Sequence, residues 1–183
     1  MISKLLALLL IVVLSPIFAI IAFLIFIEDG RPVFFIQKRI GVKNSTFNMF
    51  KFRTMKKDTP NIATHLLIDP EKYLLRIGKV LRKLSFDELP NLINIIKGEM
   101  VFVGPRPALF NQYDLMELRT KYGIEKLKPG ITGWAQINGR DEISIQKKVS
   151  LEQEYLNKKS LLFDVKIFFL TFVSVFKSEG ITH

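Results

Sequence analysis

The chain has 183 residues, of which 49% are hydrophobic, yet its formal net charge is +10. The absence of cysteine excludes disulfides, thiolate metal sites and a cysteine nucleophile. The only histidines are His65 and His183, in a polar stretch and at the chain end, so a histidine triad or a zinc site is not expected.

Charge is distributed unevenly along the chain. Lys4 is the only charged residue before Glu28, so the remainder carries a net charge of +9. A hydrophobic chain whose polar part is this basic is typical of a protein lodged in a membrane. Its polar part is then expected to bind phosphates, whether of nucleic acid, nucleotide or lipid.

The residues from Leu5 to Ile27 form an apolar stretch, about 23 residues long, that is sufficient as a helix to cross a membrane. No small-residue cleavage site follows it, which disfavours a signal peptide. At its centre Pro16, preceded by Ser15, cannot donate to the backbone and predicts a kink. Basic residues on both sides favour two cytoplasmic ends. These features support a spanning helix and a re-entrant helix, broken at Ser15-Pro16, about equally.

Two aromatic-rich runs, Val33–Ile36 and Phe47–Phe52, are separated by a polar loop and predict a β-hairpin. Many basic residues of this region are explained by a cationic surface facing solvent or lipid. Lys51 and Arg53 lie among aromatic residues, which makes them better candidates for a binding site. An irregular surface loop is expected from Asp58 to Ile68.

Asp87 and Glu88 are adjacent carboxylates and the candidate reaction centre. A carboxylate can attack phosphorus, the nearby Arg82 can hold an anionic substrate, and a helix N-terminus adds N–H donors. Pro90 is tolerated in a first helical turn, which places Asp87 near the helix start, where the helix dipole is expected to lower its pKa. The alternative is that Ser85 and Glu88 form only a capping box.

Regular elements are expected on both sides of the carboxylates. Helical periodicity predicts helices over Glu71–Lys83 and from Leu89 to Gly98. Val101–Val103 is a candidate buried strand that leads into Gly104–Pro107. The prolines flanking Arg106 restrict its backbone, which suits bidentate binding of phosphate. A rigid turn with an exposed arginine is the alternative.

The last third of the chain combines helices with a glycine-rich loop. A helix is expected over Ala108–Tyr122, and an irregular loop over Lys128–Arg140. Four side chains of that loop could line a nucleotide or head-group pocket: Trp134, Gln136, Asn138 and Arg140. Trp134 suits a membrane anchor equally well. Phe163–Phe176 is too short to span a membrane and is expected at the membrane interface or over the core.

Five motifs occur in one order along the chain: Lys51–Met55, Ser85–Pro90, Lys97–Met100, Val103–Pro107 and Pro129–Gln136. In these motifs the chain resembles the bacterial sugar transferase family, and within it the small monotopic phosphoglycosyl transferases. The resemblance extends over nearly the whole chain. No P-loop or dinucleotide-binding fingerprint occurs beside these motifs.

This resemblance implies a mainly helical α+β fold. Residues 1–28 would form a re-entrant membrane helix broken at Ser15-Pro16. Residues 29–183 would form a cytoplasmic catalytic domain with a short β-hairpin and interfacial amphipathic helices. The protein would lie in the bacterial inner membrane with its active site on the cytoplasmic face. Membrane lipid is an expected partner, a homodimer is allowed, and nucleic acid is not expected.

The resemblance also implies a reaction that depends on Mg²⁺. Asp87 would attack the sugar-bearing phosphate of a UDP-sugar and release UMP, and polyprenyl phosphate would then accept the sugar phosphate. Asp87 and Glu88 would hold the metal, and Arg106 and Arg82 would hold phosphate. The further candidates for substrate binding are Lys51, Arg53, Gln136 and Arg140.

A protein of another class would also fit the composition, namely a non-catalytic, membrane-tethered basic module that binds nucleic acid or anionic lipid. It would leave the Asp87-Glu88 pair unexplained. The sequence does not specify the sugar, and the stretch from Ile143 to Lys148 is where we expect sugar selectivity.

Overall fold

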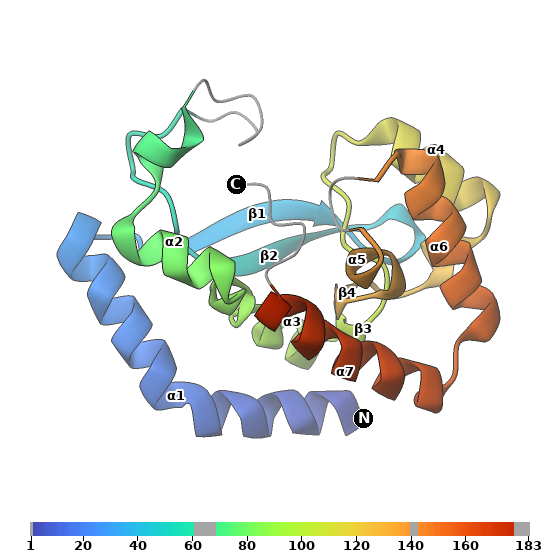
Figure 1. Ribbon diagram of the computed structural model, residues 1–183, viewed down its shortest axis with the longest axis horizontal. Helices are drawn as coiled ribbons and strands as arrows, with labels where there is room; N and C mark the ends of the chain where they lie inside the picture. The colour runs from blue at the N-terminus through green and yellow to red at the C-terminus, as the bar shows by residue number, and fades with distance from the viewer. Residues whose placement is uncertain (1, 61–68, 140–142, 178–183) are drawn as a thin grey trace.

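The computed structural model describes residues 2–60, 69–139 and 143–177. It is mainly helical with two small sheets, as predicted (Figure 1). The helices are α1 (Ile2–Asp29), α2 (Arg76–Lys83), α3 (Asn91–Lys97), α4 (Tyr113–Lys121), α5 (Trp134–Ile137), α6 (Ile145–Lys158) and α7 (Leu161–Lys177). The strands are β1 (Phe34–Ile40), β2 (Thr46–Phe52), β3 (Val101–Val103) and β4 (Gly130–Thr132). Most of the predicted loop after Asp58 lies outside the described residues.

Helix α1 continues through Ser15 and Pro16, and it bends near its middle without ending there (Figure 1). Pro16 has no N–H to offer the carbonyl of Val12, but the Ser15 hydroxyl donates to that carbonyl at 2.8 Å. The predicted break is therefore a bend in the structure, because a side chain supplies the missing donor.

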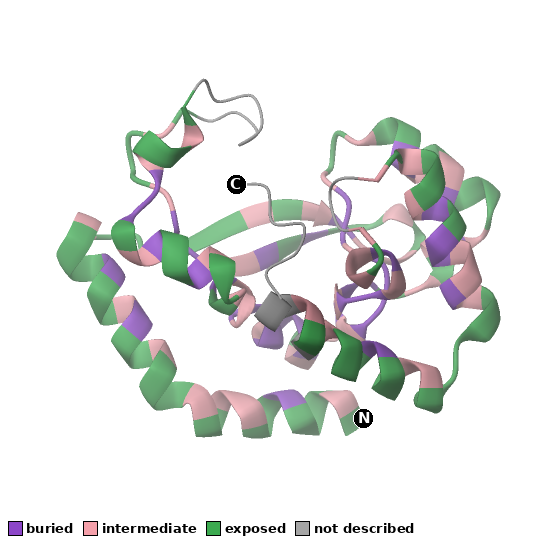
Figure 2. Cartoon of the chain, viewed as in Figure 1, coloured by how far each residue is buried: buried purple, intermediate pink, exposed green. Residues whose placement is uncertain are grey.

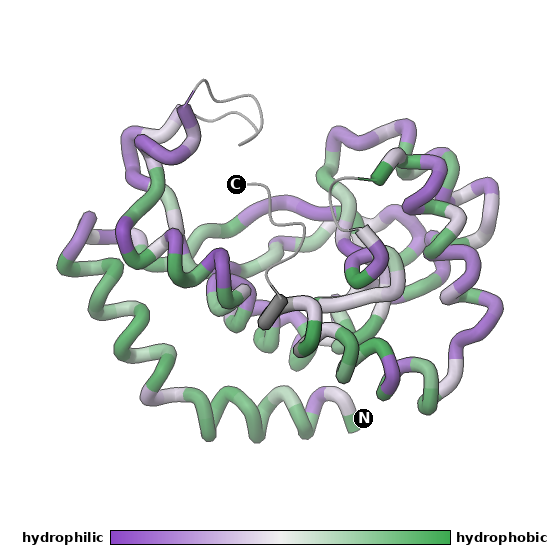
Figure 3. Tube along the Cα trace, in the orientation of Figure 1, coloured by the Kyte–Doolittle hydropathy of each residue, from purple (hydrophilic) through white to green (hydrophobic). Residues whose placement is uncertain are grey.

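One face of α1 packs on the rest of the molecule, while its other faces expose apolar side chains (Figure 2). Ile21 and Ile25 are buried, and the ring of Phe18 packs edge-on against that of Phe52 with centroids 5.3 Å apart. Within the described residues, α1 is the one helix that is long and apolar enough to cross a membrane. Helix α7 also exposes many apolar side chains, and the two helices form an apolar edge of the molecule (Figure 3).

Strands β1 and β2 form the predicted hairpin, which is antiparallel with a register that runs from Phe34↔Phe52 to Ile40↔Thr46. The hairpin crosses the middle of the molecule between α2 and the pair α4 and α6 (Figure 1). Ala7 of α1 and Ile95 of α3 share a buried cluster with Met49 of β2. The hairpin therefore links the apolar edge to the helices around the carboxylates.

Strand β3 pairs in parallel with β4, which lies inside the stretch predicted to be an irregular loop. Gly104 and Gly130 bring the two backbones into direct contact. A Cβ at Gly130 would collide with the backbone nitrogen of Gly104, and a Cβ at Gly104 would collide with the carbonyl of Lys128. Only glycine fits such an approach, so the backbone that enters the Arg106 segment is fixed by backbone contact.

Two predicted helices begin later than expected because residues at their start pair with the hairpin or with the residues that follow it. The predicted helix over Glu71–Lys83 is a short turn, Pro70–Tyr73, followed by α2. Between them the N–H of Leu75 donates to the carbonyl of Thr54 at 2.9 Å. In the same way, the carbonyl of Ala108 accepts from the N–H of Ile40 at 2.9 Å, and α4 begins only at Tyr113. Long-range pairing overrides the local helical pattern at both places.

Candidate active site

Asp87 and Glu88 lie in a single 3₁₀ turn, Phe86–Glu88, between α2 and α3. Ser85 precedes this turn in the left-handed region, with φ of 58°, and its side chain makes no capping bond. Pro90 occupies the N-cap of α3. The capping-box alternative is therefore wrong, and the carboxylates precede α3 instead of sitting in its first turn.

Three cationic side chains surround the two carboxylates. The Nζ atom of Lys51, on β2, lies 2.7 Å from Glu88 Oε1 and 3.8 Å from Asp87 Oδ2. Arg106, which follows β3, donates to Glu88 Oε1 at 3.2 Å. Arg82, on α2, donates to the Thr54 hydroxyl at 3.0 Å, and its charge acts on Asp87. The structure thus brings five of the predicted site residues together from four segments of the chain.

The two carboxylates differ strongly in their pKa values. Burial raises the pKa of Asp87 above its ordinary value; Lys51 opposes this effect and the charge of Glu88 adds to it. The prediction that the helix dipole lowers the pKa of Asp87 is wrong, because burial raises that pKa by more. Burial alone would also raise the pKa of Glu88, but Lys51 and Arg106 hold it well below its ordinary value. Adjacent groups with separated pKa values are suited to separate chemical roles.

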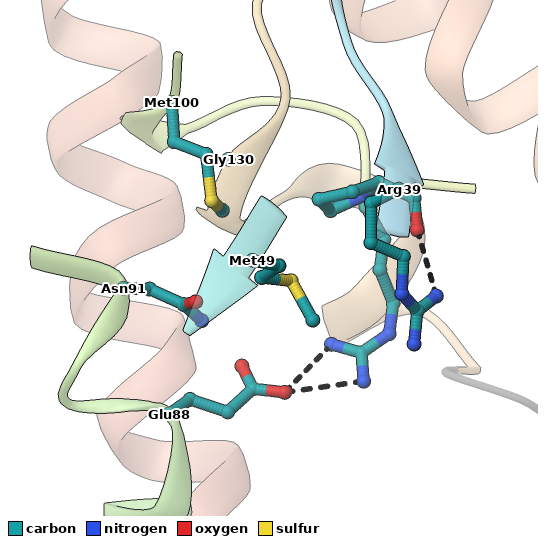
Figure 4. Close-up of a pocket in the computed structure, with 8 residues that line it drawn as sticks. Arg39, Met49, Glu88, Asn91, Met100 and Gly130 are labelled. Atoms are coloured by element: carbon teal, nitrogen blue, oxygen red, sulfur yellow. Dashed lines mark hydrogen bonds and ion pairs between the residues drawn. The ribbon is translucent and has the colours of Figure 1, made fainter. Parts of the chain in front are cut away.

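A small cavity lies beside Glu88 and Arg106 and is also lined by Asn91, Arg39 and Met49 (Figure 4). The Asn91 side chain is 1% exposed, and its Oδ1 atom has no hydrogen-bond partner among the described residues. Leaving such an atom unpaired costs about 1–3 kcal/mol, so a ligand or ion that pairs with it gains affinity. The sequence analysis missed Asn91, although its place directly after Pro90 in the carboxylate motif was a usable signal.

Comparisons with known proteins bear on the family of the chain. The family model described as bacterial sugar transferase matches residues 1–178. The chain belongs to the bacterial sugar transferase family. The predicted family is therefore confirmed.

The chain is also similar to several known proteins. Over 85% of its length the chain is 44% identical to an uncharacterized sugar transferase, EpsL, of Bacillus subtilis (strain 168), and the match covers 75% of that protein. It is 36% identical over 96% of its length to the exopolysaccharide production protein ExoY of Sinorhizobium fredii, 84% of which is covered. It is 38% identical to the UDP-glucose:undecaprenyl-phosphate glucose-1-phosphate transferase of Escherichia coli (strain K12), over 96% of this chain but only 39% of that one.

The oxygen atoms of this sugar transferase's site suit Mg²⁺. No group of three His, Cys, Asp or Glu side chains that could hold a metal occurs in the described residues. Mg²⁺ is commonly bound by one or two carboxylates, with substrate phosphates and waters completing its shell. Asp87 and Glu88 provide two carboxylates, and the unpaired Asn91 Oδ1 provides a third oxygen. The donor set therefore fits Mg²⁺ bound together with a phosphate substrate.

Arg53 has contacts of another kind. It is 6% exposed, forms an ion pair with Asp29 and donates to the carbonyl of Gly30 at 2.7 Å. These bonds fasten the end of α1 to the end of β2. They give no support to the prediction that Arg53 binds substrate.

The remaining candidates lie around α5. The Nε2 atom of Gln136 donates to the carbonyl of Ile131 at 3.0 Å, while its Oε1 is buried without a partner among the described residues. The indole N–H of Trp134 donates to Glu154 at 2.9 Å, and its ring packs on Phe163. Arg140 lies outside the described residues. Gln136 thus keeps one acceptor for a ligand, whereas the contacts of Trp134 are with α6 and α7.

Proposed function

We propose that this transferase moves a sugar-1-phosphate from a UDP-sugar to polyprenyl phosphate and releases UMP. One observation carries the proposal: Asp87, a buried carboxylate with a raised pKa, faces three cations while its neighbour Glu88 is tied to two of them. A raised pKa makes a carboxylate a better nucleophile, and the cations allow it to approach an anionic phosphate. Two relatives are named for the transfer of glucose phosphate to undecaprenyl phosphate.

In the first step, an Asp87 oxygen attacks the sugar-bearing phosphorus of the UDP-sugar. A bond forms between that oxygen and phosphorus, the bond from phosphorus to the bridging oxygen breaks, and UMP leaves with the electron pair. Lys51 and Arg106 stabilise the charge that spreads over the phosphate oxygens. The charges of Lys51 and Arg82 favour the ionised form of Asp87 against the effect of burial on its pKa.

In the second step, an oxygen of polyprenyl phosphate attacks the same phosphorus. The bond to Asp87 breaks and the carboxylate is regenerated, so that the product is a polyprenyl diphosphate sugar. No proton has to move in either step, which suits a site whose ionisable groups are carboxylates, lysine and arginines. The apolar edge formed by α1 and α7 offers the acceptor a lipid-facing approach.

Bound Mg²⁺ would supply Lewis-acid stabilisation of the phosphate oxygens. Asp87, Glu88 and Asn91 are the residues that would hold it. Glu88 is suited to this task because its pKa lies well below its ordinary value, so it stays ionised. Asn91 adds an oxygen without adding charge.

The membrane topology is part of the proposal. Helix α1 would enter the inner membrane, bend at Ser15-Pro16 and return, with the remainder of the chain on the cytoplasmic face. Single cysteines at Ser3 and at the exposed Ser150 test this arrangement in a chain that has no other cysteine. Both should resist an impermeant maleimide in intact cells and react after lysis. Labelling of Ser3→Cys alone in intact cells would show a spanning helix.

The reaction is tested by incubating the purified enzyme with Mg²⁺ and a panel of UDP-sugars, first without acceptor. We expect stoichiometric release of UMP and a sugar-phosphate adduct on Asp87 in mass spectrometry. Polyprenyl phosphate should then discharge the adduct. A protein that retains anionic lipid, releases no UMP and loses binding steeply with salt would instead be a binding module.

A further inference from the structure

Helices α4 and α6 contribute a second buried charge pair, Arg119 and Glu152, which the proposed reaction does not use. The guanidinium of Arg119 donates to both carboxylate oxygens of Glu152, at 2.8 and 2.5 Å. Arg119 is 7% exposed and Glu152 is 1% exposed. A desolvated, doubly bonded pair of this kind has a fixed geometry.

The pair reaches the active site through one further bond. The Nη2 atom of Arg119, which donates to Glu152 Oε1, also donates to the backbone carbonyl of Arg106, at 2.9 Å. The side chain of Arg106 in turn bonds Glu88. The buried pair thus holds the backbone of a residue whose side chain faces the reacting carboxylates.

The carbonyls of residues 105–107 are held one by one. The carbonyl of Pro105 accepts from the N–H of Gly130 at 2.9 Å, that of Arg106 from Arg119, and that of Pro107 from Arg39 at 3.1 Å. Proline rings fix φ at two of these positions and remove the N–H groups that would otherwise anchor the backbone. Pro107 also restricts the ψ of Arg106. The bonds to the carbonyls then hold the orientation of the peptide planes, and with it the direction in which the Arg106 side chain leaves the backbone.

Helix α6 holds the strand before this segment as well. The hydroxyl of Tyr155, one turn after Glu152, lies 3.1 Å from the carbonyl of Val103. The hydroxyl also lies 2.7 Å from the carboxylate of Asp164, at the start of α7. Glu152 and Tyr155 share one face of α6, so the helix supports the backbone on both sides of Gly104.

We propose that Arg119 and Glu152 are positioning residues that aim the Arg106 guanidinium at the substrate phosphate. This inference rests on the proposed role of Arg106 in phosphate binding. Glu152 orients Arg119, and Arg119 fixes the Arg106 carbonyl. The charge of the pair is matched internally, so its contribution to catalysis is geometric.

The test begins with Glu152→Gln and Arg119→Lys, assayed for UMP release with the UDP-sugar that the panel identifies. Lysine keeps the charge opposite Glu152 but lacks the planar fork that reaches the carbonyl as well. Displacing a phosphate-binding group by about 1 Å can cost about 100-fold in rate. We expect kcat/KM to fall about 10- to 100-fold in both variants. Glu71→Gln, which breaks an exposed pair with Lys79, should leave kcat/KM unchanged.

A double-mutant cycle with Arg106→Ala separates positioning from general loosening of the fold. If Glu152 acts through Arg106, Glu152→Gln should have less than about a twofold further effect once Arg106 is alanine. Effects that multiply in the double variant would overturn the inference and leave the proposed reaction intact. Full activity of Arg106→Ala would overturn the role of Arg106 and this inference with it.

Folding is checked in the same preparations by thermal melting. Should Glu152→Gln fail to fold, Arg119→Lys carries the test alone, because it retains the buried ion pair. Wild-type kcat/KM in a folded Arg119→Lys enzyme would contradict the proposal.

Discussion

Two buried clusters of charge in this molecule are built in opposite ways. The site cluster, comprising Lys51, Arg82, Asp87, Glu88 and Arg106, sets three cations against two carboxylates. The strut pair, Arg119 and Glu152, sets one cation against one carboxylate with both oxygens bonded. Within the site cluster the contacts are unequal: the Nζ atom of Lys51 lies 2.7 Å from a Glu88 oxygen but 3.8 Å from an Asp87 oxygen.

This difference separates a structural use of charge from a chemical one. The strut pair satisfies its own charges, so it has nothing left to offer a ligand. The site cluster has a surplus positive charge, which an anionic phosphate neutralises. It also has a carboxylate that burial destabilises, which a bound metal ion stabilises. Substitutions in the site cluster should therefore lower activity without lowering stability, whereas substitutions in the strut pair should lower both.

The largest expected effect is on activity in the site cluster. Asp87→Asn should lower kcat by at least about 10⁴-fold, because the nucleophile is removed. Its melting temperature should equal or exceed that of the wild type. The pKa of Asp87 is raised on folding, so its contribution to stability is greatest at low pH and is lost as pH rises through that pKa. Thermal melting at neutral pH checks this, and a clearly lower melting temperature would break the contrast between the clusters.

The second prediction concerns stability in the strut pair. Glu152→Ala should lower the free energy of unfolding by about 3–5 kcal/mol, because it leaves a buried guanidinium unpaired. The double variant Arg119→Met with Glu152→Leu should recover most of that stability but not the activity, since the carbonyl of Arg106 still lacks its donor. Chemical denaturation in detergent and the UMP assay measure the two properties. Glu71→Ala, in the exposed pair with Lys79, should change stability by less than about 1 kcal/mol.

The third prediction concerns the unpaired amide beside the site cluster. Asn91→Leu removes a buried acceptor that has no partner among the described residues and keeps the branched shape of the side chain. The free energy of unfolding should rise, by about 1–3 kcal/mol at most, because an unpaired polar group is no longer buried. At the same time, stabilisation of the protein by Mg²⁺ in a melting assay should weaken. Equal stabilisation of both proteins by Mg²⁺ would exclude Asn91 as a metal ligand.

The smallest expected effect is a shift in pH dependence. Lys51 is the strongest of the charges that favour ionised Asp87, so Lys51→Met should raise the pKa of Asp87 further. The acidic limb of kcat/KM against pH should then move to higher pH, apart from any fall in the maximum. A limb that stays in place while the maximum falls would assign Lys51 to phosphate binding alone.

Local patterns were sufficient for the elements that local contacts determine. The hairpin, the helix that ends at Gly98 and the final apolar helix were all predicted, because alternation and helical spacing reflect neighbouring residues. The strand β4 and the late start of α2 were not predicted. They depend on pairing with Val101–Val103 and with Thr54, both distant in sequence.

The site shows the same contrast between features set by neighbouring residues and features set by distant contacts. Asp87, Glu88 and Arg106 were recognisable from their motifs, but their pKa values depend on burial that only the assembled fold provides. Arg53 was chosen because it lies among aromatic residues, which could not reveal its ion pair with Asp29. Glu152 lies in a helix that also carries lysines and a second glutamate, so its burial had no local signal.

The contact between Gly104 and Gly130 has a practical consequence for redesign. Where two backbones touch, no side chain remains whose exchange could fine-tune the distance between them, so these glycines are best left out of any mutant library. Diversity aimed at a new sugar donor belongs instead in the stretch from Ile143 to Lys148, where we expect sugar selectivity. An engineer can then vary what the enzyme selects while the phosphate-handling end of the site keeps its shape.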